Sequence, residues 1–166
     1  MMFYSHSKTT KEGKTNGTKE ISAHTQGVIK KAISSLSDEP DFDISASDFK
    51  KLIETIIKFH DFGKYTTYFQ NYLLKNEHVD YLLKQHARIG GIVAYNFLKQ
   101  TDSKLALIGL YVIFHHHTYL KDIQQFPENF NENLSRIIHV QAEDILNNIK
   151  LIEKELEFKP LSGYLS

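Results

Sequence analysis

Cysteine is absent from this chain of 166 residues. Its absence excludes disulfide bonds, thiolate zinc sites and thiol catalysis, and leaves histidine and carboxylate as the strong metal ligands. The longest apolar run, LALIGLYVIF at 105–114, is about half the length of a membrane span. The first twenty residues hold no apolar segment of signal-peptide length. We therefore expect a cytoplasmic protein with no membrane partner.

The chain also lacks net charge, because 20 lysines and arginines balance 20 aspartates and glutamates. Such a balance gives no overall attraction toward nucleic acid, so any polyanionic substrate must be held by a local site. The length suits one domain with a sizeable core and is short for two. We expect a single domain over residues 1–166.

Helical periodicity dominates the chain after its first residues. Apolar side chains recur at three- and four-residue spacing over about 20–37, 49–61, 79–100, 105–114 and 132–157. Pro40 and Pro127 mark loops between these segments. Residues 1–19 are polar and show neither helical nor strand period, which favours a flexible arm or loop. The pattern predicts an all-α fold without strands.

A histidine and an aspartate follow one of these helices directly, in the segment HDFGK at 60–64. Ser45 is suited to cap the start of that helix. Its apolar phase continues to His60, and Gly63 offers the left-handed residue that commonly ends a helix. His60 and Asp61 are therefore expected in the last turn, facing inward. Lys64 follows just outside, where it could bind a phosphate or simply be solvated.

Histidine is abundant, with nine residues. A single inward histidine is most simply a core residue that is hydrogen-bonded to a carbonyl, and we interpret His78 and His139 in this way. His6 is interpreted as a surface residue. Six others lie where a helix faces inward or ends: His24, His60, His86, His115, His116 and His117. A shared metal centre would give these imidazoles one common partner, as in helix-bundle metal sites.

The presence of Asp61 beside His60 favours a centre with two ions. Neighbouring helical residues diverge by about 100°, so the pair can approach such a centre from different directions. A carboxylate can bridge two ions, which together activate a water and stabilise the oxyanions of a phosphoryl displacement. Imidazole and carboxylate accept manganese, nickel, cobalt, iron or zinc, with magnesium as a further candidate.

The set of motifs resembles a known family. His24, HDFGK at 60–64, His86 in QHARIGG and the histidines of HHHTYLKDI are together similar to the HD superfamily of metal-dependent phosphohydrolases. More narrowly they resemble the HD nuclease domain, Cas-three, of the type I CRISPR-associated helicase-nuclease. The opening Tyr-Ser-His at 4–6 is also similar to that family. The resemblance covers residues 4 to about 125.

The resemblance implies a compact helical HD bundle with a dinuclear metal centre that cleaves single-stranded DNA. His24, His60 and Asp61 would bind one ion, and Asp61 would bridge to the second. His86 and the double histidine would complete the second site. Lys64 matches the family lysine beside the substrate phosphate, so Asp61 and Lys64 would be the catalytic residues.

Two departures from the family pattern leave choices open. Three histidines stand where the family has two, and the following TYLKDI favours His116 and His117 over His115. The family also has a late aspartate ligand, for which Asp122 and Asp144 are the candidates. Neither matches well, so the C-terminal part of the family domain is missing here or this member differs. The chain would then be a stand-alone subunit or an excised domain.

Three functions remain in competition. The first is a metal-dependent endo- or exonuclease on single-stranded DNA in type I CRISPR interference, an antiviral defence, with a helicase domain or subunit and a CRISPR effector complex as partners. The second is an HD phosphohydrolase acting on nucleotides or cyclic nucleotides. The third is a catalytically silent HD-like module that binds partners.

Overall fold

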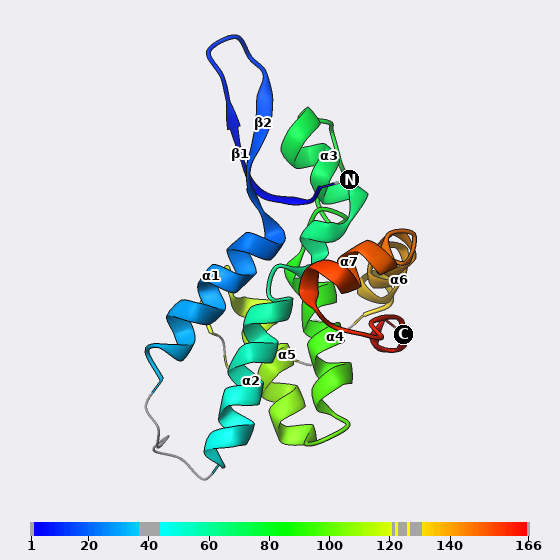
Figure 1. Cartoon of the computed structure of the whole chain (residues 1–166). Coiled ribbons are helices and arrows are strands. Elements are labelled where there is room, and N and C mark those ends of the chain that lie inside the picture. Colours follow the sequence, from blue (N-terminus) through cyan, green and yellow to red (C-terminus); the bar gives the residue numbers. More distant parts are fainter. Residues whose placement is uncertain (1, 37–43, 121, 123–125, 127–130, 166) are drawn as a thin grey trace.

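α-Helices form most of the protein in the computed structural model, which describes residues 2–36, 44–120, 122, 126 and 131–165 (Figure 1). The helices are α1 (Ile21–Ile33), α2 (Ala46–Phe59), α3 (Thr67–Lys75), α4 (Ala87–Leu98), α5 (Ser103–His115), α6 (Glu132–Leu146) and α7 (Ile149–Leu156), with the 3-10 turns η1 (Phe62–Tyr65) and η3 (Ser162–Tyr164). The expectation of a mostly helical fold is confirmed. The segments around Pro40 and Pro127 lie outside the described residues.

The N-terminal segment is a β-hairpin, so the expectation of an arm or loop without strands was wrong. Strand β1 (Tyr4–Thr9) pairs antiparallel with β2 (Thr15–Glu20), and Gly13 takes a left-handed turn conformation with φ of +82°. The hairpin is fixed at its base: the Tyr4 N–H donates to Gln70 Oε1 (3.0 Å), and the Gln70 amide donates to the Tyr4 carbonyl (2.9 Å). These tertiary bonds stabilise strands whose polar sequence has no clear period.

Two helix boundaries also differ from the periodicity. The helix expected from 79 begins at Ala87, and the last helix is broken between α6 and α7. The segment before α4 forms turns because the Asp80 carboxylate accepts from the Leu82 N–H (2.8 Å). The fully buried Gln141 of α6 then donates to the carbonyls of Leu83 and Gln85 (2.8 Å each). The side-chain amide of Gln141 therefore donates the hydrogen bonds that these carbonyls would otherwise accept within a longer helix.

Helices α2, α4 and α5 lie side by side, and α1 leaves the base of the hairpin and contacts α2 (Figure 1). The main core joins Phe59, Phe62 and Tyr65, at the end of α2 and in η1, to Val93 of α4 and Ile145 of α6, all fully buried. The core thus fixes the chain immediately on both sides of His60 and Asp61. No helix in the described part of the chain is long and apolar enough to cross a membrane.

Candidate metal centre

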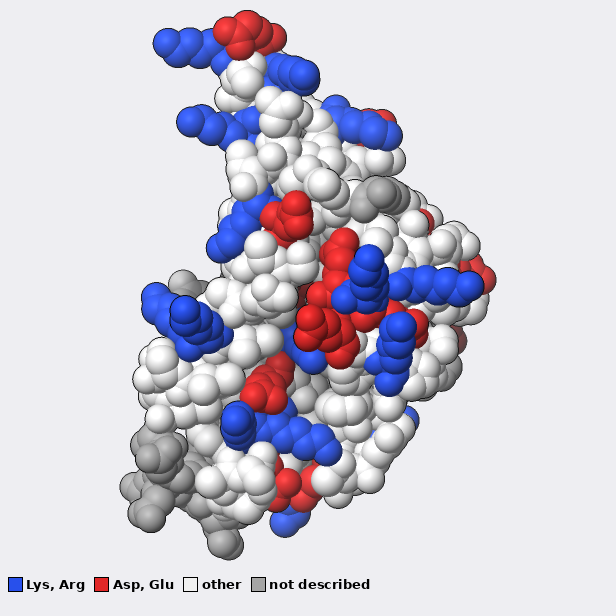
Figure 2. All heavy atoms as spheres, viewed as in Figure 1, with Lys and Arg blue, Asp and Glu red and all other residues white. Residues whose placement is uncertain are grey.

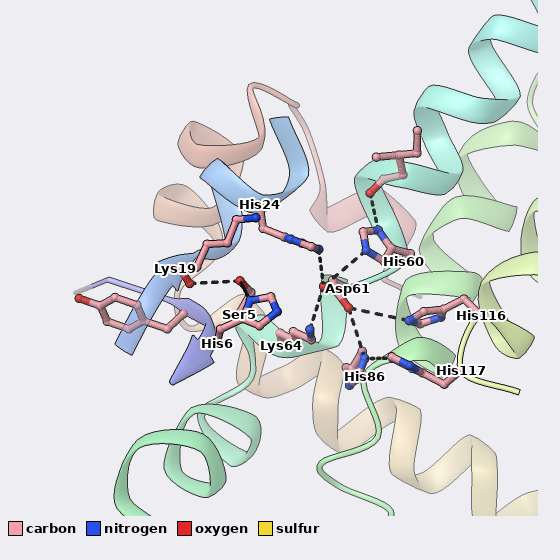
Figure 3. Close-up of polar contacts among 12 residues, drawn as sticks. Ser5, His6, Lys19, His24, His60, Asp61, Lys64, His86, His116 and His117 are labelled. Atoms are coloured by element: carbon pink, nitrogen blue, oxygen red, sulfur yellow. Dashed lines mark hydrogen bonds and ion pairs between the residues drawn. The ribbon is translucent and has the colours of Figure 1, made fainter. Parts of the chain in front are cut away.

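Asp61 lies at the centre of the predicted site and is only 3% exposed. Oδ2 faces His24 Nε2 at 3.3 Å and His60 Nε2 at 3.4 Å, and Oδ1 faces His86 Nε2 at 3.3 Å and His116 Nε2 at 3.8 Å (Figure 3). Imidazoles from separate elements therefore converge on the two oxygens of one buried carboxylate.

The convergence results largely from where three helices begin or end. Phe59 is the last residue of α2, and Asp61 leaves the helical conformation with φ −102° and ψ 11°. His86 is the N-cap residue of α4 and His116 the C-cap residue of α5. The expected helix phase does not extend through Asp61, and His86 lies at a helix end rather than on a helical stripe. His24 on α1 is the member of the set that lies within a helix.

Gly63 is required for a reason that the sequence did not reveal. Its conformation is not left-handed, because Gly13 is the glycine with positive φ in the described chain. Instead, the Gly63 N–H donates to the His86 carbonyl (3.2 Å), and a Cβ on Gly63 would lie 2.5 Å from His86 Cα. The absence of a side chain lets the HDFGK segment touch the backbone of His86 and so places His86 beside Asp61.

We expect Gly63→Ala to destabilise the fold by roughly 1–3 kcal/mol and to weaken metal binding, because the added methyl group must push His86 away. Gly27→Ala is a matched control, since a Cβ there meets nothing within 4 Å. Gly27 lies within α1, so its replacement should stabilise by up to about 1 kcal/mol. Chemical denaturation and metal titration of both variants check this. Equal stability of the two variants would contradict the close approach.

Two of the imidazoles have a tautomer that their backbone contacts determine. His60 Nδ1 lies 2.6 Å from the Ile57 carbonyl oxygen, and His116 Nδ1 lies 2.7 Å from the Ile113 carbonyl oxygen. A carbonyl only accepts, so each Nδ1 carries the proton, and in the neutral form of either ring the lone pair lies on Nε2, the nitrogen that faces Asp61. Hydrogen bonds of this kind orient histidine ligands in metal sites.

The electrostatics favour neutral rings around an ionised carboxylate. Burial lowers the pKa of His24, His60, His86 and His117, the last to about 4. Burial of Asp61 alone would raise its pKa, but the contacts with His116 and His86 and the positive charge of Lys64 hold the pKa well below its usual range. Neutral imidazole and carboxylate are the forms that bind metal ions.

The donors fall into two sets that share Asp61. One set is His24, His60 and Asp61, and the other is Asp61, His86, His116 and His117, with the candidate ligand atoms of each set within 4.8 Å of one another. Two ligand atoms each about 2.1 Å from one ion are roughly 3.4 Å apart at a tetrahedral angle. The imidazole-to-carboxylate distances of 3.3–3.4 Å fit that spacing. Among described residues, His116 Nε2 and His24 Nδ1 are buried without a hydrogen-bond partner.

Lys64 is buried rather than solvated, at 8% exposed, and its Nζ lies 2.8 Å from Asp61 Oδ2. Lys64 does follow the end of α2 as expected, but the alternative of a solvated lysine was wrong. The 3-10 turn η1 folds Lys64 back over Asp61, three residues earlier, so the ammonium compensates the buried carboxylate.

Of the remaining predicted residues, some belong to a donor set and the others lie outside both sets. His117 Nε2 lies 2.7 Å from His86 Nε2, while His115 turns away, with Nδ1 3.2 Å from Thr118 Oγ1. His78 and His139 are exposed outside both sets, so their interpretation as inward core residues was wrong. Asp144 accepts from the backbone N–H of Thr67 (2.6 Å) and from its hydroxyl (2.8 Å), so it stabilises the start of α3. Asp122 is exposed, and neither aspartate belongs to a donor set.

His6 lies closer to the centre than its sequence suggests. It is exposed, but its ring centroid lies 5.4 Å from that of His24 (Figure 3). The buried Ser5 hydroxyl donates to the Lys19 carbonyl (3.1 Å) and lies 2.8 Å from His6 Nδ1. The Tyr-Ser-His opening was the available signal, and only the hairpin brings it to the site.

Comparison of the chain with models of known protein families, with curated proteins and with solved structures finds no match.

Proposed function

We propose that the protein is an HD-type phosphodiesterase with two divalent transition-metal ions, one on each side of Asp61, that cleaves single-stranded DNA. The observation that carries the proposal is the orientation of His60 and His116, whose carbonyl-bound Nδ1 atoms leave Nε2 lone pairs directed at a carboxylate. When these rings are neutral, a lone pair faces the carboxylate, and a metal cation bound between them would stabilise that arrangement. His24 and His86 complete the two sides.

Support for the substrate comes from the motif resemblance and from the edge of the site. His117 of the second donor set is exposed, and so is His6 beside His24, so the site reaches the protein surface instead of closing over a small ligand. An open edge suits a phosphodiester within a chain. The HDFGK context supports action in type I CRISPR interference with a helicase and an effector complex.

In hydrolysis, two bound ions supply an activated water and neutralise charge on the phosphate oxygens. Burial lowers the pKa of His24, His60 and His86 and so favours their neutral forms, while the contacts around Asp61 hold its pKa low and favour the carboxylate. Buried carbonyl contacts fix the rings of His60 and His116, so little reorganisation is needed. When no ion is bound, the ammonium of Lys64 compensates the negative charge of Asp61. A bound ion would compete with Lys64 for Asp61 Oδ2. The Lys64 ammonium would then turn toward the substrate phosphate.

An activity screen separates the competing functions. Purified protein with manganese, nickel or cobalt is incubated with labelled single-stranded DNA, with mononucleotides and with cyclic nucleotides. The proposal requires cleavage of the DNA that stops on chelation. Intact DNA with hydrolysed nucleotides would instead establish a nucleotide phosphohydrolase, and a protein that binds no metal and hydrolyses nothing would be the silent module.

We expect Lys64→Ala to lower turnover by roughly 10–100-fold while the metal content stays unchanged, because the ammonium acts on the phosphate rather than as a ligand. Lys58→Ala is the control, since Lys58 Nζ lies 5.2 Å from the Phe158 ring and belongs to neither donor set. Steady-state kinetics and elemental analysis check both variants. Loss of metal from Lys64→Ala would show that the role of Lys64 is structural.

A further inference from the structure

A cluster of two exposed aromatic rings and one lysine lies next to the metal centre. Lys84 Nζ is 4.1 Å from the ring centroid of Tyr72 and 6.0 Å from that of Tyr81. The two tyrosines are 41% and 67% exposed. We call Tyr72, Tyr81 and Lys84 the stacking surface. It offers flat π faces beside a positive charge, the combination by which proteins bind unpaired bases.

The stacking surface is connected to the candidate metal ligands by one intervening ring. Phe69 of α3 lies 6.3 Å from Tyr72 and 5.3 Å from His86, measured between ring centroids. The ammonium of Lys64 lies 5.6 Å from the Phe69 ring. The stacking surface therefore lies within reach of the nucleotides next to a phosphate held at Lys64 and His86.

A polar groove continues from Tyr72 between α3 and the hairpin. It has a volume of about 390 Å³, and the residues that line it include Ser7, Thr9, Thr15, Tyr72, Lys75 and Asn76. Hydroxyl, amide and ammonium groups are the donors that proteins use toward nucleic acid phosphates. Lys8, Lys11 and Lys14 lie on the hairpin, and lysine side chains gather at its projecting end (Figure 2). We call this the hairpin groove.

We propose that the stacking surface and the hairpin groove hold single-stranded DNA on one side of the scissile phosphate, with bases on Tyr72 and Tyr81 and the backbone along the groove. The inference rests on the proposed function and adds the path of its substrate. Stacking needs unpaired bases, whereas the paired bases of a duplex are stacked on one another. The preference for single strands would thus reside in Tyr72 and Tyr81 rather than at the metal ions.

The test is single-turnover cleavage of a labelled fifteen-nucleotide oligothymidylate with manganese, measured as the protein concentration that gives half the maximal rate. Tyr72→Ala and Tyr81→Ala should each raise this concentration about 5- to 100-fold. Tyr72→Phe and Tyr81→Phe keep the ring and should restore it. Lys84→Gln should reduce the slope of log affinity against log salt by about 0.7.

Lys99→Ala is the matched control for Lys84, because Lys99 Nζ lies 5.5 Å from the Tyr95 ring at the opposite end of α4 from His86. It should behave as wild type. Unchanged half-maximal concentrations in both alanine variants, with cleavage intact, would overturn the strand path and leave the proposed function standing. Failure of the wild-type protein to cleave the oligonucleotide would overturn the proposed function and the path with it.

Discussion

Asp61→Ala will abolish hydrolysis and release metal from both sides of the centre. Asp61 supplies Oδ2 to the set with His24 and His60 and Oδ1 to the set with His86 and His116. Removal of one shared ligand therefore affects two ions, unlike loss of any single histidine. Because the proposed ions would activate the nucleophile, we expect turnover to fall by at least about 10³-fold. Activity assays and elemental analysis of the purified variant measure both effects.

Asp144→Asn provides the control for this variant. Asp144 is one of the two candidates for the late aspartate of the family pattern, and it accepts hydrogen bonds from Thr67 at the start of α3. Its replacement should cost about 1 kcal/mol of stability and leave metal content and turnover unchanged. Substantial residual activity in Asp61→Ala, or loss of metal in Asp144→Asn, would contradict the assignment of Asp61 as the bridge.

Chelation will lower the melting temperature markedly. The imidazoles converge on Asp61 only in the folded chain, so metal binding stabilises that state. At a free metal concentration 100 times the dissociation constant, each site adds about 2.7 kcal/mol. For a domain of this size that corresponds to roughly 5–10 °C per site. Thermal unfolding with manganese, and after chelation, measures the difference.

Two histidine variants make the chelation experiment specific. His116→Ala removes an oriented donor and should reduce the metal-dependent increase in melting temperature. His139→Ala removes an exposed imidazole that pairs with Glu143 at 3.3 Å, and it should respond to metal like wild type. A wild-type melting temperature that does not change on chelation, in a protein without bound metal, would support the silent module instead.

The helical part of the fold was accessible from the sequence where burial follows a simple period. Ser45 caps α2 as expected, accepting from the Asp48 N–H at 3.1 Å. The hairpin was missed because Gln70 and the buried Phe3, rather than an alternating pattern, hold it in place. The turns before α4 were missed because Gln141, distant in sequence, satisfies their carbonyls. Both errors arise from tertiary hydrogen bonds that override local periodicity.

The sequence predicted which residues form the site. It did not predict the helix ends and backbone contacts that hold them in place. The motif context favoured His116 and His117 over His115, and the structure brings the first two to Asp61. Helix ends, rather than inward helical stripes, place His60, His86 and His116. The carbonyl partners of His60 and His116 leave no mark in a sequence, and neither does the close backbone contact at Gly63.

A crystal structure of the protein soaked with manganese, with anomalous scattering recorded at the metal edge, tests the central claim most directly. A dinuclear centre bridged by Asp61 requires two anomalous peaks about 3.5–4 Å apart. One should lie among His24, His60 and Asp61, and the other among Asp61, His86, His116 and His117. Absence of any peak beside Asp61, or a single peak bound by other residues, would contradict a dinuclear centre bridged by this carboxylate.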